Sequence, residues 1–111
     1  MQIVVSASVT FDAGHRTALP PDCYVSQHGH RWEVKAAADG EQALPALLEH
    51  LATIANELRN RDLNTMLPGV TPTPTGLAAY VRERINLAVP TLVSVWVDNG
   101  VFASMVMVER R

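Results

Sequence analysis

The sequence predicts an α+β domain in which two strands are followed by two helices and two more strands. Near the N-terminus apolar and polar residues alternate, two central segments carry apolar residues at helical spacing, and an Asn-Gly pair separates two apolar runs near the C-terminus. These patterns indicate strands, amphipathic helices and a hairpin turn, respectively. With 111 residues, 48% of them hydrophobic, the chain is long enough for one core. We therefore expect a single domain over residues 1–111.

The first two strands are predicted from residues that alternate along one face. Odd positions over 5–13 are apolar, and His15 continues that face. Even positions over 28–36 form the corresponding face of a second strand, which Asp39-Gly40 closes. Between them, Pro20-Pro21-Asp22 is typical of a turn, so residues 17–27 are expected to form a loop.

The two helices are predicted from apolar residues spaced three and four apart. The first covers about 43–60 and presents a stripe of Leu44, Leu47, Leu48, Leu51, Ile54 and Leu58. A linker over 61–74 contains several prolines. The second helix is expected to start near Thr75 as N-cap, to end before Pro90 and to bury Leu77, Tyr80, Val81, Ile85 and Ala88. Strands over 92–97 and 101–108 then flank the hairpin turn Asp98-Asn99-Gly100.

Composition excludes several classes of function. The net charge of −2 and the pI near 6.0 provide no basic stripe for a phosphate backbone, so nucleic acid is not an expected partner. The single cysteine, Cys23, cannot form an intrachain disulfide, and no apolar run is long enough to span a membrane. We expect a soluble, cytoplasmic protein without a membrane partner.

Three histidines are the candidate functional residues. His28 and His30 lie two apart on a predicted strand, so both imidazoles point to the same side, and His15 ends the preceding strand on its apolar face. Three imidazoles without a fourth side chain resemble a catalytic zinc site, which keeps one position for water or substrate. The alternative is that these histidines are packed and hydrogen-bonded in the core. His50, on the flank of the first helix, is expected to be solvated and receives no role.

The sequence resembles the 6-pyruvoyl-tetrahydropterin synthase and 6-carboxy-tetrahydropterin synthase family. The resemblance rests on Phe11-x-Ala13-x-His15-Arg16, Cys23, His28-Gly29-His30, Leu58-x-x-x-x-Leu63-Asn64, Pro72-Thr73, Leu77-Ala78 and Phe102-Ala103. It implies a tunnelling fold, in which each subunit contributes a four-stranded antiparallel sheet with two helices on one face. Subunits of that fold close into an oligomeric barrel, a trimer or a hexamer of two stacked trimers, with active sites between subunits.

The resemblance also implies an activity and a set of site residues. In the family, zinc holds the side-chain hydroxyls of 7,8-dihydroneopterin triphosphate, a cysteine thiolate moves protons on that side chain, and triphosphate leaves. His15, His28 and His30 occupy the positions of the zinc (Zn²⁺) ligands, and Cys23 occupies the position of the base. A thiol near a cation loses its proton more readily, which suits that role. The alternative for Cys23 is a small buried apolar residue.

Several positions depart from the family pattern. The Asp-His pair that assists the cysteine is replaced by Arg59 and Asn60. The glutamate that grips the pterin ring aligns with Val97, and the glutamate after Pro-Thr aligns with Thr75. The Asp-Phe pair before the first helix is Ala43-Leu44. A pterin edge facing valine would leave buried donors without partners, a loss of about 1 to 3 kcal/mol each.

Two classes of function remain open. One is a zinc-dependent lyase or cyclase of the pterin synthase type, acting on a pterin-like or other zinc-chelating small molecule. The other is a non-catalytic zinc-binding member that serves as an oligomeric scaffold or as the partner subunit of a complete paralogue. The open coordination position and Cys23 favour the enzyme, whereas the loss of Asp-His favours the scaffold. An aldolase acting on dihydroneopterin is less well supported, because its histidine pattern differs.

Overall fold

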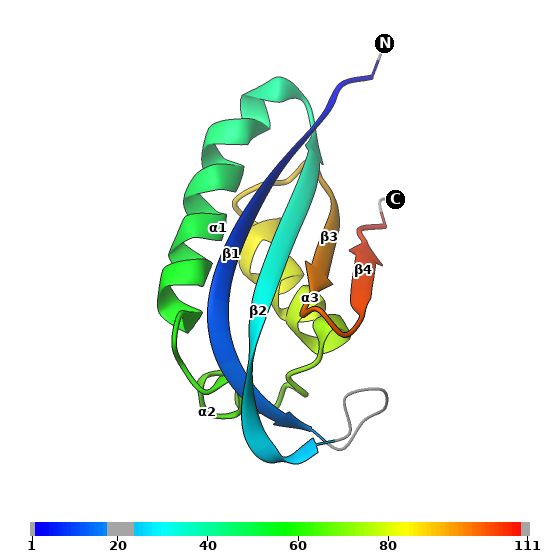
Figure 1. Cartoon of the computed structure of the whole chain (residues 1–111). Coiled ribbons are helices and arrows are strands. Elements are labelled where there is room, and N and C mark those ends of the chain that lie inside the picture. The colour runs from blue at the N-terminus through cyan, green and yellow to red at the C-terminus, as the bar shows by residue number, and fades with distance from the viewer. Residues whose placement is uncertain (1, 18–23, 110–111) are drawn as a thin grey trace.

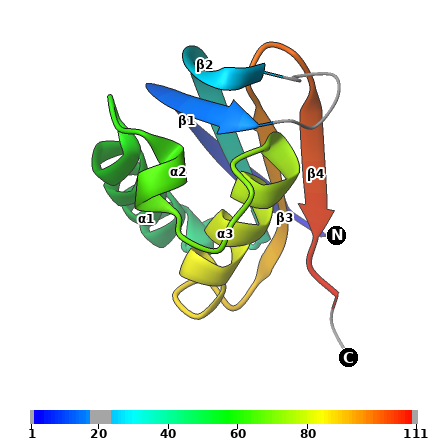
Figure 2. The same cartoon turned by 90° about the horizontal axis from the view of Figure 1, so that it is seen from below.

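The computed structural model describes residues 2–17 and 24–109. It shows two layers, a sheet and helices packed on one of its faces (Figures 1 and 2). The sheet has four antiparallel strands in the order β1-β2-β3-β4. The elements, in chain order, are β1 (Val4–Thr17), β2 (Tyr24–Asp39), the 3-10 turn η1 (Glu41–Ala43), α1 (Leu44–Leu58), α2 (Leu63–Met66), α3 (Pro74–Asn86), β3 (Leu92–Asp98) and β4 (Ala103–Met107). The predicted α+β class and the order of strands and main helices are confirmed. In the described residues, no helix is long and apolar enough to cross a membrane.

β1 and β2 form a long hairpin that reaches past the rest of the sheet. They pair continuously from Val4 opposite Asp39 to His15 opposite His28, and after a shift of register Thr17 lies opposite Tyr24. In contrast, β3 pairs with β2 only between Glu33 and Ala38. The end of the hairpin therefore extends beyond β3, as Figure 1 shows. The loop predicted over 17–27 is wrong for Thr17, which ends β1, and for residues 24–27, which belong to β2. Tyr24 and Val25 are good strand formers, and this preference outweighs the nearby turn signal.

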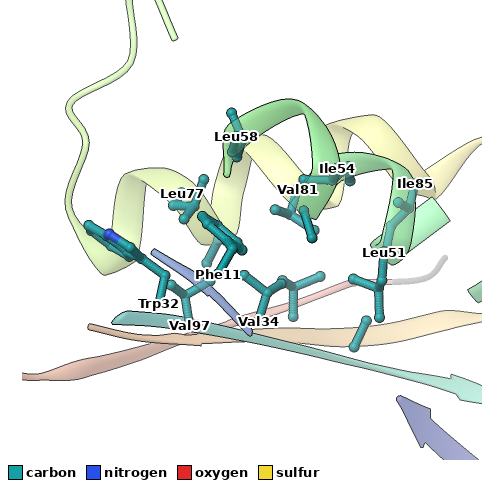
Figure 3. Close-up of a cluster of buried hydrophobic side chains, with 14 of the residues drawn as sticks. Phe11, Trp32, Val34, Leu51, Ile54, Leu58, Leu77, Val81, Ile85 and Val97 are labelled. Atoms are coloured by element: carbon teal, nitrogen blue, oxygen red, sulfur yellow. The ribbon is translucent and has the colours of Figure 1, made fainter. Parts of the chain in front are cut away.

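The core lies between the sheet and the two main helices (Figure 3). Side chains from the sheet point toward α1 and α3, as the predicted alternation requires. Each fully buried large apolar side chain contributes about 1.5 to 3 kcal/mol to stability. The labelled core side chains, all buried, are Phe11, Trp32, Val34, Leu51, Ile54, Leu58, Leu77, Val81, Ile85 and Val97.

α1 lies close to its predicted range, with one difference on its apolar stripe. Leu47 and Leu51 are buried, but Leu48 is 49% exposed. Leu48 follows Leu47 by one residue, which is about 100° around the helix axis, so its side chain lies at the border of the stripe. Leu48 thus belongs to the predicted apolar stripe but lies at its exposed border.

α3 begins before its predicted start and ends before its predicted last buried residue. Thr73, not Thr75, is the N-cap, and Pro74 occupies the first helical turn. N–H groups in the first turn of a helix have no acceptor within the helix. Proline, which lacks an N–H, is therefore favoured there. The helix ends at Asn86, so Ala88 lies beyond it and is exposed rather than buried.

The linker predicted over 61–74 contains the short helix α2. Asp62 is its N-cap, because one carboxylate oxygen accepts the N–H of Asn64 at 3.0 Å. Its other oxygen accepts the hydroxyl of Thr65 at 3.2 Å. Aspartate before a short apolar segment is a helix-start signal, and it could have predicted this turn.

The turn between β3 and β4 confirms the predicted hairpin but shortens the last strand. Gly100 has a φ of 88°, a conformation that favours glycine. The side-chain oxygen of Asn99 accepts the N–H groups of Val101 and Phe102 at 3.0 and 3.2 Å. These two residues are therefore held in the turn, and β4 is shorter than predicted at both ends.

An ion pair joins the solvent-facing sides of α1 and α3. The two guanidinium nitrogens of Arg84 lie 2.7 and 3.1 Å from the carboxylate of Glu57, and one of them also donates to the hydroxyl of Tyr80 at 2.6 Å. Tyr80, predicted to be buried, is partly exposed and packs against the core. The hydrogen bonds from Arg84 hold the pKa of Glu57 below its usual value, and those from Glu57 raise the pKa of Arg84.

Glu57→Gln is expected to lower stability only slightly and only above acidic pH. Because the folded pKa of Glu57 is depressed, its contribution is fully present above the unfolded value of about 4.3 and is lost as pH falls through the folded pKa. For a pair exposed to solvent we expect a cost below about 1 kcal/mol at pH 7. Urea unfolding at pH 7 and at pH 3 measures this, with Glu49→Gln on the same helix as control. A cost for Glu57→Gln that persists at the lower pH would contradict the assignment.

Candidate metal centre

The three candidate histidines come together at the far end of the β1–β2 hairpin. His15 lies directly opposite His28 in the ladder, and Ala13 lies opposite His30. The ring centroids are 4.6 Å apart for His15 and His28, 4.8 Å for His15 and His30, and 4.7 Å for His28 and His30. One ring nitrogen from each lies within 4.8 Å of the others. The ligands of a tetrahedral zinc with bonds of about 2.1 Å lie about 3.4 Å apart, so the three nitrogens would have to move closer together to hold the ion.

His15 is held by a backbone group from a distant part of the chain. Its ring is fully buried, and its Nδ1 lies 2.6 Å from the carbonyl oxygen of Pro72. A carbonyl oxygen only accepts, so Nδ1 carries the proton and donates it. The lone pair is then on Nε2, the atom that would ligate a metal. A histidine ligand oriented in this way through its other nitrogen is typical of metal sites, so the residues fit the zinc ion that the sequence pattern implies.

The segment that carries the Pro72 carbonyl is itself tightly fixed. The N–H of Thr73 donates to the carbonyl oxygen of Thr71 at 2.8 Å. The hydroxyl of Thr73 accepts the N–H of Gly76 at 3.1 Å, which caps α3. A Cβ atom on Gly76 would overlap the carbonyl oxygen of Thr71. Glycine is therefore required for this turn to approach the helix so closely, and the turn in turn positions His15.

Gly76→Ala is expected to weaken metal binding as well as stability. The added methyl group must displace Thr71, and with it the Pro72 carbonyl that orients His15. We expect a loss of about 1 to 3 kcal/mol in unfolding free energy, and a loss of about 10- to 100-fold in zinc affinity, as for other groups that orient metal ligands. Competition with a colorimetric chelator measures the affinity.

Gly69→Ala is the matched control for that variant. Gly69 has a φ of 82°, but nothing lies within 4 Å of a Cβ built on it. This change strains the backbone by about 1 to 2 kcal/mol without pushing on the turn at Pro72. It should therefore leave zinc affinity unchanged, and equal zinc affinity in Gly76→Ala and wild type would show that the turn does not position His15.

Trp32 closes the inner side of the histidine cluster. Its ring centroid lies 5.1 Å from that of His15 and 5.9 Å from that of His30, both edge to face. Its Nε1–H donates to the carbonyl oxygen of Ala13 at 3.1 Å, so the buried indole is satisfied. The tryptophan keeps the inner side of the cluster apolar, which strengthens electrostatic interactions there.

The end of β1 is fixed by Asn64. Its side-chain oxygen accepts the N–H of Arg16 at 2.7 Å, and its amide donates to the carbonyl oxygen of Arg16 at 3.0 Å. Arg16 directly follows His15, so α2 holds the strand that carries this ligand. The contributions of Asn64, Pro72 and Trp32 to the site were not predicted. The capping signal at Asp62 could have placed Asn64 at the start of a helix, but not opposite Arg16.

Cys23, the candidate base, lies outside the described residues. Its role remains a prediction from the resemblance.

The positions that depart from the family pattern lie in different settings. Asn60 adopts a φ of 59°, just past the end of α1, and its N–H donates to the carbonyl oxygen of Asp12 at 2.6 Å. It borders a groove that His30 also lines. Val97 is fully buried and points toward the helices beside Trp32 (Figure 3). An apolar residue at position 97 is thus part of the core.

Asp98 follows Val97 and Thr75 follows Pro74, and both side chains make hydrogen bonds that stabilise the fold. Asp98 accepts the N–H of Gly100 at 2.7 Å through one carboxylate oxygen, so this carboxylate stabilises the β3–β4 turn. The hydroxyl of Thr75 donates to the hydroxyl of Ser104 at 2.9 Å, which links α3 to β4.

Comparisons with known proteins agree with the fold. Caenorhabditis elegans 6-pyruvoyl tetrahydropterin synthase superposes with a TM-score of 0.80 at 16% identity, over 98% of this chain and 97% of that one. An uncharacterized protein of Wolinella succinogenes gives 0.68 at 17% identity, over 98% and 99%. Plasmodium falciparum 6-pyruvoyl tetrahydropterin synthase gives 0.68 at 12% identity, over 95% and 96%. At such identities these likenesses show the fold.

Sequence comparisons give the family. No curated protein matches this chain. The sequence model of the family described as 6-pyruvoyl tetrahydropterin synthase matches residues 4–106, a range that contains both histidine-bearing strands and all the helices. The chain belongs to the 6-pyruvoyl tetrahydropterin synthase family.

Proposed function

We propose that this protein is a zinc-dependent lyase or cyclase whose small-molecule substrate chelates the metal through neighbouring oxygen atoms. The observation that carries the proposal is the cluster of His15, His28 and His30, with ring nitrogens within 4.8 Å of one another. The bond from His15 to Pro72 supports it, because it leaves Nε2 as the ligating atom. Three protein ligands leave a position for substrate, whereas structural zinc sites usually have four.

The chain's own residues divide the chemistry between them. Bound zinc supplies Lewis acidity, which makes a carbon next to a bound oxygen easier to deprotonate. His15, His28 and His30 would hold and orient the zinc ion, and Trp32 would keep water from the inner side of the histidine cluster. Cys23 takes and returns the proton at the substrate carbon, since a thiol near a cation is easily ionised.

The substrate is proposed to differ from the usual one of the family. Asn60 stands where the family has a histidine, and an amide does not titrate near neutral pH. Val97 stands where the family has the pterin-gripping glutamate, and its side chain is buried in the core. A relative of the pterin side chain, with vicinal hydroxyl or carbonyl oxygens and less ring recognition, fits these residues better than an intact dihydropterin.

One experiment tests whether the proposed activity depends on zinc and on Cys23. Zinc-loaded protein is incubated with 7,8-dihydroneopterin triphosphate, dihydroneopterin and simpler vicinal diols, and products are followed by mass spectrometry. We expect turnover of at least one compound, loss of that turnover on chelation, and recovery when zinc is restored. Cys23→Ala should abolish the activity while keeping zinc, and an active Cys23→Ala variant would remove the cysteine from the mechanism.

The second candidate is a non-catalytic zinc-binding member that acts as an oligomeric scaffold or as the partner of a complete paralogue. The observation that favours it is Asn60, which removes a proton carrier from the groove beside His30. It predicts zinc-dependent thermal stability without turnover of any compound in the panel. Zinc-dependent turnover by the isolated chain would rule it out.

We also propose that the chain assembles into a trimer or hexamer. Among the described strands, β4 pairs with β3 alone, so its outer edge is open, and Met105 and Met107 beside that edge are each 57% exposed. Proteins seldom leave such an edge uncovered. Sedimentation equilibrium at micromolar concentration should show three or six chains per particle. A monomer there would contradict the barrel expected from the resemblance.

A further inference from the structure

The hairpin that carries the histidines also borders a second feature, an open groove of about 610 Å³. It runs between the end of the hairpin and the segment that follows α1. That segment lies along the outer edge of β1, because the N–H of Gly14 donates to the carbonyl oxygen of Arg61 at 3.0 Å. The residues that line the groove are Asp12, Ala13, Gly14, Gly29, His30, Arg31, Asn60 and Arg61.

The groove is hollow because two glycines face each other across the hairpin. Gly14 lies directly opposite Gly29 in the β1–β2 ladder. Strand alternation places both on the face opposite to the histidines, where any other residue would present a side chain. Nothing lies within 4 Å of a Cβ built on Gly29. The bare backbone thus forms the floor of the groove.

The charges that line the groove favour an anion. Arg31 and Arg61 are both exposed at its walls, and Asp12 is the one acidic residue among those that line it. Asp12 already accepts a hydrogen bond from the Nε of Arg31 at 3.2 Å. A guanidinium has five N–H donors, so Arg31 keeps its terminal nitrogens for another acceptor. The charged side chains that line the groove therefore have a positive net charge, although the net charge of the whole chain is −2.

We propose that this groove binds a small oxyanion, a phosphate or carboxylate group of a metabolite, between the guanidinium groups of Arg31 and Arg61. The paired N–H groups of arginine match the oxygens of both anions. The backbone floor at Gly14 and Gly29 allows the anion to approach the hairpin without a side chain in the way. The site adjoins the proposed zinc site, since His30 and Asn60 also line the groove. It goes beyond that zinc chemistry because Arg31, Gly14 and Gly29 alternate with the histidines along their strands and so lie on the other face of the hairpin.

Isothermal titration calorimetry with inorganic phosphate and, separately, with succinate tests the site. Wild-type protein should bind at least one of them saturably, and the preferred anion tells phosphate from carboxylate. Arg31→Gln and Arg61→Gln should each weaken binding about tenfold, as expected for the loss of charged hydrogen bonds. Gly29→Val should abolish binding without any change of charge, because its side chain fills an open groove.

Two controls separate this site from general electrostatics and from the metal. Lys35→Gln removes an equal charge from the same face of β2, about 13 Å along the strand from Arg31, and should change the affinity less than twofold. His15→Ala removes a proposed zinc ligand that does not line the groove, and should keep anion binding. No saturable binding, an equal loss in Lys35→Gln, or a loss in His15→Ala would overturn the proposal. The last result would place the anion on the metal and leave the proposed zinc function intact.

Discussion

Replacing any one of His15, His28 or His30 by alanine is expected to remove most of the zinc that the wild-type protein holds. A site with three protein ligands has no redundancy, so each loss leaves two. We expect about one zinc per chain in the wild type and a small fraction of that in each variant, by inductively coupled plasma mass spectrometry. The loss should be largest for His15→Ala, because this ring is fully buried and anchored to Pro72.

The matched control for these variants is His50→Ala. His50 lies on α1, outside the cluster of potential ligands. Its loss should leave both zinc content and folding unchanged, which excludes a general effect of removing a surface imidazole. Full zinc occupancy in His28→Ala and in His30→Ala would show that the three rings are a packed cluster rather than a metal site.

The ligand set could be predicted from sequence because it depends on strand geometry alone. A period of two places His28 and His30 on one face, and His15 follows from the apolar face of the preceding strand. The structure places all three on that face, with His15 and His28 directly opposite each other. The register between the two strands could not be predicted, since it depends on how far the hairpin extends past residues 17–27.

The groups that support the ligands could not be predicted in the same way. Pro72 is separated from His15 by 57 residues, and no local pattern reports that its carbonyl meets an imidazole. The same is true of Asn64 and Arg16, which are 48 residues apart. The predicted start of α3 was wrong for a different reason. Both Thr73 and Thr75 can act as N-caps, and only the position of Pro74 decides between them.

The fold also distinguishes two of the positions that depart from the family pattern, Val97 and Asn60. Without a structure, Val97 could be a ligand-facing residue that lost its glutamate. Its full burial beside Trp32 shows that the valine stabilises the core. Introducing glutamate there would bury a carboxylate without a partner, so Val97→Glu is not a useful restoration. Asn60, in contrast, is exposed at a groove and can be exchanged without disturbing the core.

Turnover of 7,8-dihydroneopterin triphosphate is expected to be at least about 100-fold slower than in a family member with the intact Asp-His pair, since a general acid or base usually contributes about 100- to 10,000-fold. Asn60 cannot carry a proton near neutral pH. His50 cannot replace it, because it lies about 12 Å along the axis of α1 from Leu58. Steady-state assays of zinc-loaded protein measure this deficit.

The double variant Arg59→Asp/Asn60→His restores the missing pair and should recover at least about tenfold of that rate. Both positions are exposed, and histidine, like asparagine, tolerates the φ of 59° found at residue 60. Arg59→Asp alone is the control, because it changes the charge without supplying a proton carrier. If wild-type turnover already matches that of an intact relative, another group has replaced the histidine. If instead the double variant gains nothing over Arg59→Asp while zinc remains bound, residue 60 does not reach the reacting atoms, and the loss of Asp-His does not explain the divergence of this chain.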